Sequence, residues 1–178
     1  MSSPKPVPLS RRLCLRMLSA VGAAGYLGKA QAVSAAANAG ALAGATAPLV
    51  RLELTDTQWK VRLSPAQYKV LRQAGTERAG TSALNNEKRK GRYICVACDH
   101  RLFTSDMKFD SGTGWPSFFT TLPGAFKTST DYKLLYPRTE YHCARCDGHH
   151  GHVFKDGPAP TGQRWCNNGV ALKFEVAA

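Results

Sequence analysis

Two Cys-x-x-Cys pairs constrain the fold of this chain more than any other feature of its sequence. Cys95 and Cys98 lie in the run CVAC, and Cys143 and Cys146 lie in the run CARC. Four thiolates at this spacing are the commonest ligand set of a closed, tetrahedral zinc site, with zinc–sulfur distances of about 2.3 Å. Structural Zn²⁺ on these four cysteines is therefore expected. It would tie the chain near Tyr93 to the chain near Cys143 and stabilise a small domain.

The same four cysteines are also compatible with one or two disulfides in an oxidising compartment, or with an iron–sulfur centre. A closed four-sulfur site has no open coordination position, so the metal is not expected to be the catalyst. A zinc-ribbon module that binds nucleic acid would have the same ligands. The rest of the chain must therefore distinguish between these classes of protein.

The sequence after Gly91 is typical of a small antiparallel β domain. Short runs rich in β-branched and aromatic residues are separated by Gly, Pro and Asp, and no alternation of strands with helices occurs. The runs expected to form strands are RYICV, RLFTS, MKFDS, SFFTTL, AFKTST, EYHCARC, GHVFKD, QRWCNN and VALKFEV. A mainly β catalytic domain is expected over residues 53–178.

Two short helices are expected before this β-rich region, within residues 54–63 and 64–75. Each begins with a hydroxyl residue suited to cap the helix, and the second ends at a glycine. The residues that carry these signals are Thr55 and Gln58 in the first helix, and Ser64, Pro65 and Gly75 in the second. Both helices are expected to be packing elements without chemistry.

Residues 1–32 have the parts of an export signal. The charged run SRRLCLR precedes the apolar run MLSAVGAAGYLG and the small residues AQA. The paired Arg11 and Arg12 resemble the bacterial twin-arginine signal, which a receptor reads, so export to the periplasm is expected. A mitochondrial or plastid transit peptide is the alternative. The apolar run is shorter than the about 20 residues of a spanning helix, so no stable membrane insertion is expected.

Residues 33–52 are rich in Ala, Gly and Thr and are expected to form a spacer without a packed core. The chain has a formal net charge of +12. Six of the 24 basic residues precede Glu53, where no acidic residue occurs, so half of the excess positive charge lies in that segment. The remaining charges are interspersed as on a solvated surface. Because the basic residues lack interleaved aromatic residues, nucleic acid is not expected as a partner.

Three further stretches carry polar and aromatic residues that a zinc ribbon would not need. They are FDSGTGWPSF, GHHGHVFKDG and QRWCNNGVALKF. The histidines are equally compatible with surface positions or with a second metal site, and the lone Cys166 with a buried free thiol. The candidate residues are Trp115 and Phe118 on a Gly/Pro-rich loop, then His149, His150, His152 and Asp156, and finally Arg164, Cys166 and Asn168.

Arg164 favours a functional reading of Cys166. Alternation along a strand places residues 164, 166 and 168 on one face. A cation beside a thiol lowers the pKa of the thiol and favours the nucleophilic thiolate. The sequence therefore predicts an activated cysteine at position 166.

Four runs together resemble the methionine-R-sulfoxide reductase family, MsrB. They are GRYICVACDHRLF, KFDSGTGWPSF, RTEYHCARCDGHHGHVFKDGP and PTGQRWCNNGVALKF, and the resemblance extends from about Leu54 to the C-terminus. It implies two antiparallel sheets in a tent-like arrangement, short N-terminal helices and zinc on the four paired cysteines. Where many members have a Pro-Phe-Thr-Gly run followed by Trp-Asp, this chain has RAGTSALNN.

The resemblance also implies roles for the candidate residues. Cys166 would be the nucleophile, and Trp115 and Phe118 would hold the substrate. The surrounding catalytic residues would be His149, His152, Asp156, Arg164 and Asn168. The expected enzyme is a peptide-methionine (R)-S-oxide reductase, an oxidoreductase that repairs oxidised proteins and whose substrate is methionine-R-sulfoxide, free or in proteins.

In the expected mechanism the Cys166 thiolate attacks the sulfoxide sulfur. A protonated His152, relayed by His149, gives a proton to the oxygen, and Cys166 is left as a sulfenic acid. Some family members have a resolving cysteine where this chain has Thr113, and Cys14 would leave with the export signal. The expected reductant is therefore a thioredoxin-like protein or a small thiol, acting on a monomeric enzyme.

Two other functions are compatible with part of this set of residues. A zinc-stabilised binding module without turnover would not need Arg164, Cys166 and Asn168 on one face. A thiol peroxidase would use Cys166 but would not need Trp115.

Overall fold

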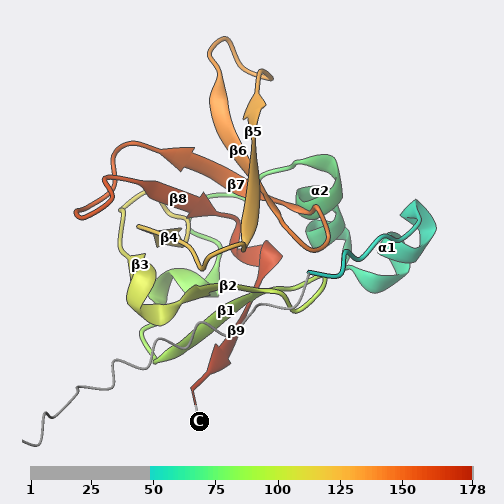
Figure 1. Cartoon of the computed structure of the whole chain (residues 1–178), viewed down its shortest axis with the longest axis horizontal. Helices are drawn as coiled ribbons and strands as arrows, with labels where there is room; N and C mark the ends of the chain where they lie inside the picture. Colours follow the sequence, from blue (N-terminus) through green and yellow to red (C-terminus); the bar gives the residue numbers. More distant parts are fainter. Residues whose placement is uncertain (1–48, 178) are drawn as a thin grey trace, which may run out of the picture. The chain divides into compact units, whose positions relative to one another are not determined.

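The part of the chain described by this computed structural model, residues 49–177, contains nine strands in two antiparallel sheets (Figure 1). The expected export signal at 1–32 and most of the expected spacer at 33–52 lie outside the described residues. At the end of the spacer, the Leu52 amide donates a hydrogen bond to the Arg145 carbonyl at 2.8 Å, and the Leu52 side chain packs against the core.

The smaller sheet has the order β2-β1-β9, and the larger has the order β3-β4-β8-β7-β6-β5. Each of the nine predicted runs overlaps one strand, so the prediction of a mainly β, antiparallel domain is confirmed. The smaller sheet consists of β1 (Gly91–Cys95), β2 (Arg101–Thr104) and β9 (Leu172–Val176). The larger sheet consists of β3 (Lys108–Phe109), β4 (Ser117–Phe118), β5 (Phe126–Asp131), β6 (Arg138–Cys143), β7 (His149–Phe154) and β8 (Arg164–Asn167).

Both predicted helices are present, as α1 (Asp56–Arg62) and α2 (Pro65–Gln73), and each begins with the predicted capping box. The end of α2 differs from the prediction, because Ala74 rather than Gly75 adopts the left-handed conformation, with φ of 48°. Gly75 is needed there for space, since a Cβ would lie 2.8 Å from the Lys69 carbonyl oxygen. Three single-turn 3₁₀ helices, η1 (Ala83–Asn86), η2 (Ser105–Met107) and η3 (Gly169–Ala171), complete the described elements.

The core between the two sheets is filled by aromatic rings from both. Phe103 of β2 stacks on Phe118 of β4 with ring centroids 3.8 Å apart, and Tyr93 of β1 meets the edge of Phe118 at 4.9 Å. Tyr141 of β6 is also fully buried, and its hydroxyl donates to Asn167 Oδ1 of β8 at 3.0 Å. Contact between the sheets therefore depends on large aromatic rings. The Tyr141 hydroxyl is hydrogen-bonded, whereas the buried Tyr93 hydroxyl has no partner among the described groups.

The four paired cysteines form a buried cluster that links the two sheets. Cys95 ends β1 of the smaller sheet and Cys143 ends β6 of the larger sheet. Both helices dock onto these turns through arginines. Arg62 of α1 donates to the Ala97 carbonyl at 2.6 Å, and Arg72 of α2 donates to the Cys146 carbonyl at 2.9 Å.

Strands β7 and β8 can lie close together because β7 contains a glycine. A Cβ on Gly151 would lie 1.9 Å from the Cys166 carbonyl oxygen of β8. A bulge precedes it: Tyr141 of β6 pairs with Gly151 but His142 pairs with His149, which leaves His150 as an extra residue. Residues 149 and 152, three apart, thereby reach the same face of the sheet.

Gly151→Ala is expected to lower the free energy of unfolding by about 3 kcal/mol, because the methyl group must push two central strands apart. Gly162→Ala is the matched control. Gly162 also has a positive φ, of 66°, but nothing lies within 4 Å of a Cβ built there. That variant should lose only the about 1 kcal/mol of left-handed strain. Equal losses in urea denaturation of the two variants would contradict the steric argument.

Candidate active site

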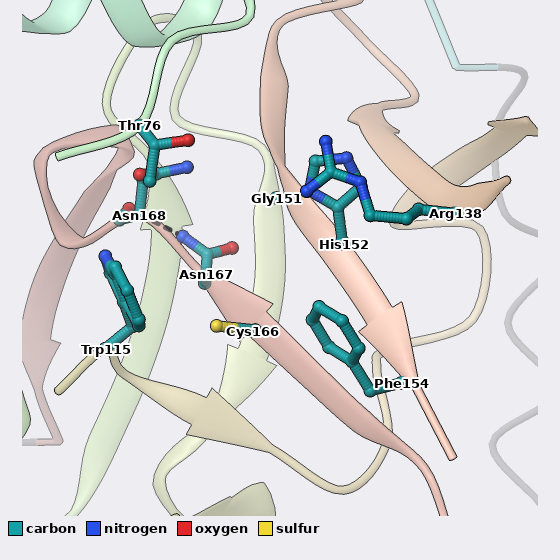
Figure 2. A pocket seen from close by; sticks show the side chains of 9 residues that line it. All are labelled: Thr76, Trp115, Arg138, Gly151, His152, Phe154, Cys166, Asn167 and Asn168. Atoms are coloured by element: carbon teal, nitrogen blue, oxygen red, sulfur yellow. Dashed lines mark hydrogen bonds between the residues drawn. The ribbon is translucent and has the colours of Figure 1, made fainter. Parts of the chain in front are cut away.

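A cavity of about 120 Å³ opens where β7 and β8 pair (Figure 2). His152 and Cys166 are directly opposite each other across these strands, so their side chains share one face. Trp115 and Asn168 also line the cavity. In Figure 2 the Cys166 side chain lies between the rings of Trp115 and Phe154. The structure thus brings three of the predicted site residues together around the thiol of a fourth, Cys166.

Several residues of the cavity wall were not anticipated from the sequence. Thr76, Arg138 and Phe154 complete much of the lining. Phe154 could have been found, because it lies two residues after His152 on the same strand and therefore on the same face. Nothing in the sequence connects Thr76 or Arg138 to Cys166, since strand pairing and loop packing bring them there.

The Cys166 thiol is half-buried, and its pKa lies above the usual value. Burial is the largest cause, while Arg164 and a hydrogen bond from Thr113 act in the opposite direction. The expectation that Arg164 lowers the pKa of Cys166 is therefore correct for that one interaction but wrong for the net direction. Desolvation disfavours the thiolate more than the neighbouring cation favours it.

The position of Arg164 explains its limited effect on the thiol. Its guanidinium makes two hydrogen bonds to the Asp156 carboxylate, at 2.9 and 2.8 Å, so much of its charge is already paired. The same guanidinium lies 4.3 Å from the centroid of the Phe154 ring. Asp156 therefore fixes the Arg164 guanidinium, which packs against the Phe154 ring as well as acting on the Cys166 thiol.

His152 is held by an acidic partner from the neighbouring hairpin. Its Nε2 lies 2.8 Å from Asp131 Oδ2, and the same oxygen accepts a hydrogen bond from Arg138 at 2.5 Å. The backbone amide of Lys133 also donates to Asp131 and is the main cause of the lowered pKa of that carboxyl group. Burial lowers the pKa of His152, and Asp131 opposes this effect. The cavity as described therefore favours neutral His152, not the protonated form expected from the sequence.

His149 lies behind His152 and is not part of the cavity wall. Its side chain is 2% exposed, and its ring centroid is 5.5 Å from that of His152. Burial lowers the pKa of His149 to about 4. His149 Nδ1 lies 2.5 Å from Glu140 Oε1, so its closest polar neighbour is a carboxylate and not the expected relay partner. His150 is fully buried on the opposite face of the strand.

Glu77 connects two residues of the cavity wall. Its backbone carbonyl accepts a hydrogen bond from Trp115 Nε1 at 3.1 Å, and its backbone amide donates to Asn168 Oδ1 at 2.9 Å. Its carboxylate accepts from the amides of Gly169 and Val170 at 2.5 and 3.1 Å. Sequence reasoning missed Glu77, because a single acidic residue in a loop carries no pattern.

The predicted substrate contact of Phe118 is wrong. The Phe118 side chain has no exposed area and stacks on Phe103 in the core between the sheets. Only Trp115 of this pair faces the cavity. The aromatic residue that accompanies Trp115 at the cavity wall is Phe154.

The four paired cysteines have the geometry of a metal-ligand set. Their Sγ atoms all lie within 4.8 Å of one another, and the Cys95–Cys146 and Cys98–Cys143 sulfur pairs are each 3.6 Å apart. Four sulfurs around one Zn²⁺ at about 2.3 Å would be about 3.8 Å apart. Disulfide sulfurs would be about 2 Å apart. The residues present therefore fit a tetrahedral metal ion and do not form disulfides.

Within residues 49–177, none of the helices has the length and apolar composition needed to cross a membrane.

Fold and site place the chain among two-sheet β proteins that are built around a four-cysteine cluster and carry a separate thiol in a pocket. A sequence profile of the SelR domain matches residues 63–176. The chain therefore belongs to the SelR-domain family, and the resemblance to MsrB proteins seen in the sequence is confirmed.

Proteins named peptide methionine sulfoxide reductase are close relatives. The chloroplastic B1 protein of Arabidopsis thaliana is 52% identical over 124 residues, which cover 69% of this chain and 61% of that protein. The MsrB proteins of Synechococcus sp. (strain RCC307) and Agrobacterium fabrum are 48% and 49% identical, covering 70% of this chain and 92% and 93% of theirs. This chain thus spans less than two thirds of the chloroplast protein but nearly all of the two bacterial ones.

Asp131→Asn is expected to lower the pKa of His152 further below its ordinary value of 6.5, because the carboxylate that opposes the effect of burial is lost. Each pKa unit lowers the protonated fraction above the pKa about tenfold. An NMR titration of the His152 ring measures this change. The pH midpoint for alkylation of Cys166 is the control and should move less, since burial and Arg164 are the largest influences on the pKa of that thiol. An unchanged or raised His152 pKa would contradict the assignment.

Proposed function

We propose that this protein reduces methionine-R-sulfoxide to methionine, with Cys166 as nucleophile. The observation that carries this proposal is the pairing of Cys166 with His152 in a cavity bounded by Trp115 and Phe154. The names of the relatives support the same activity for this chain. The R configuration follows from the family resemblance.

The cavity suits a methyl sulfoxide. A small apolar methyl group fits between the Trp115 and Phe154 rings, where contact with aromatic faces replaces contact with water. The sulfoxide oxygen is a strong acceptor and is oriented toward His152 on the neighbouring strand. This orientation leaves the sulfoxide sulfur facing the Cys166 thiol for attack.

The charge states of the site suit a reaction that needs no external proton. Burial raises the pKa of Cys166 and lowers that of His152, so the favoured state has a neutral thiol opposite a neutral imidazole. As the thiol sulfur attacks the sulfoxide sulfur, the thiol proton passes through His152 to the oxygen. The S–S bond formed by this attack and the S–O bond of the substrate then break as the hydroxyl group moves to the Cys166 sulfur. The substrate sulfur is thereby reduced to that of methionine, and Cys166 is oxidised to a sulfenic acid.

The four buried cysteines are proposed to hold a structural Zn²⁺. Zinc bound by four thiolates has no open position, and the cluster lies at the junction of the two sheets, apart from the cavity lining. Its contribution is to hold together the strands that carry the site residues. No step of the reduction requires it.

The sulfenic acid is proposed to be reduced by a separate thiol, either a small molecule or a thioredoxin-like protein. Among the described residues, the cysteines other than Cys166 all belong to the four-cysteine cluster. Thr113 lies close enough to Cys166 to lower the pKa of the thiol, and it occupies the position where some family members have a resolving cysteine. A hydroxyl cannot resolve a sulfenic acid as a disulfide.

Turnover of the separate R and S sulfoxide diastereomers of dabsylated methionine tests the reductase. With dithiothreitol as reductant, the full chain should convert the R form, and Cys166→Ser should lower the rate by at least about 10³-fold because the nucleophile is lost. Both proteins should contain one zinc. Absence of R-selective turnover in zinc-loaded protein would overturn the proposal and favour a binding module.

Thr113→Cys tests the proposed route of sulfenic acid reduction. After one turnover without reductant, the unmodified protein should carry a dimedone-reactive sulfenic acid at Cys166. The variant should instead form an intramolecular disulfide between positions 113 and 166, seen by mass spectrometry as the loss of dimedone labelling. Thr121→Cys is the control, because that residue lies on another loop. A disulfide of Cys166 in the unmodified protein would contradict the proposed intermolecular route.

A further inference from the structure

A second cluster of side chains of metal-ligand type lies on β6 and β7, on the same face of the sheet as His152. It consists of Glu140 and His142, two residues apart on β6, and His149, which is directly opposite His142 on β7. One ligand atom from each residue lies within 4.8 Å of the other two. None of the three lines the cavity of Cys166, and none belongs to the four-cysteine cluster.

The hydrogen bonding of His142 determines which of its nitrogens is free. His142 Nδ1 lies 3.4 Å from the Asp147 carbonyl oxygen, which can only accept, so Nδ1 carries the proton. In the neutral ring Nε2 is then an acceptor, and it lies 3.4 Å from Glu140 Oε1, which is also an acceptor. A histidine that donates its second N–H to a backbone carbonyl is the usual arrangement around a bound metal.

His149, like His142, faces the Glu140 carboxylate without a satisfactory hydrogen bond, and it is also buried. Its side chain is 2% exposed, and neither ring nitrogen makes a hydrogen bond of acceptable geometry with a described group. His149 Nδ1 nevertheless lies 2.5 Å from Glu140 Oε1. A buried polar atom without a hydrogen bond is destabilising, so an unpaired imidazole aimed at a carboxylate indicates a missing cation.

We propose that Glu140, His142 and His149 form a second metal site, which binds a divalent transition-metal ion of the Zn²⁺ class. Two imidazole nitrogens and one carboxylate oxygen are a known donor set for zinc with one open position. Ligands about 2.1 Å from a tetrahedral ion are about 3.4 Å apart, which matches the Glu140–His142 distance. The shorter Glu140–His149 contact lengthens when the ion enters.

Access and charge are consistent with reversible binding. The Glu140 and His142 side chains are 12% and 24% exposed, so the site is open to solvent on one side while His149 closes the other. One carboxylate and two neutral rings leave a net positive charge on the complex, which favours water or a small anion at the fourth position. The site should therefore bind more weakly than the four-cysteine cluster and fill after it.

Cobalt(II) distinguishes this site from the cysteine cluster by absorption spectroscopy. Full-length protein already loaded with one zinc is titrated with Co²⁺. One further equivalent should bind, with visible d–d bands and without the near-ultraviolet charge-transfer band that thiolate ligands produce. His142→Gln should lower the Co²⁺ affinity at least about tenfold, and Glu140→Gln should also weaken it. His100→Gln, a histidine outside the cluster, should leave the titration unchanged.

Three results would overturn the second site. They are the absence of a further equivalent, a further equivalent that persists in both His142→Gln and Glu140→Gln, and a thiolate charge-transfer band in step with the d–d bands. In the first case the carboxylate and the imidazoles share a proton instead of a metal ion. Retention of one zinc in each variant shows that the four-cysteine cluster is intact. Because the readout is metal binding, the result does not depend on the reductase activity.

Discussion

The four-cysteine cluster is the constraint on which the rest of the described structure depends. It is the point where the smaller sheet, through β1, meets the larger sheet, through β6 and the start of β7. The two helices attach to the turns of the same cluster through Arg62 and Arg72. A domain of this size has a limited apolar core, so a metal ion bound by these cysteines would add stability that packing alone does not supply.

Within the cavity, burial has a larger effect than neighbouring charge. Arg164 lies beside Cys166 and Asp131 lies beside His152. The pKa values of Cys166 and His152 nevertheless shift in the direction that desolvation dictates. The charged partners are themselves paired, Arg164 with Asp156 and Asp131 with Arg138, so they exert less influence on the thiol and the imidazole. The result is a neutral pair that can exchange one proton, in place of a permanent ion pair.

The sequence predicts the elements of this fold better than it predicts how they meet. All nine strands, both capped helices and the metal-ligand set follow from local signals such as Cys-x-x-Cys and the capping boxes. Phe118 was misplaced because a Gly/Pro-rich loop predicts exposure, whereas β4 turns that ring into the core beside Phe103. Asp131, Arg138 and Glu77 could not be found, because their roles arise from strand pairing and loop contacts between distant segments. The bulge at His150 has the same origin and is what brings His149 and His152 to one face.

Helix α2 has a double attachment. On one side Arg72 binds the Cys146 carbonyl at the cysteine cluster, and just beyond the C-terminal end of the helix Glu77 holds both Trp115 and Asn168. The shape of the cavity and the integrity of the cluster are therefore mechanically coupled through a single short helix. Disruption of the four-cysteine cluster would therefore also disturb the hydrogen bonds that position Trp115 and Asn168, and so change the cavity without any change to the Cys166 thiol itself.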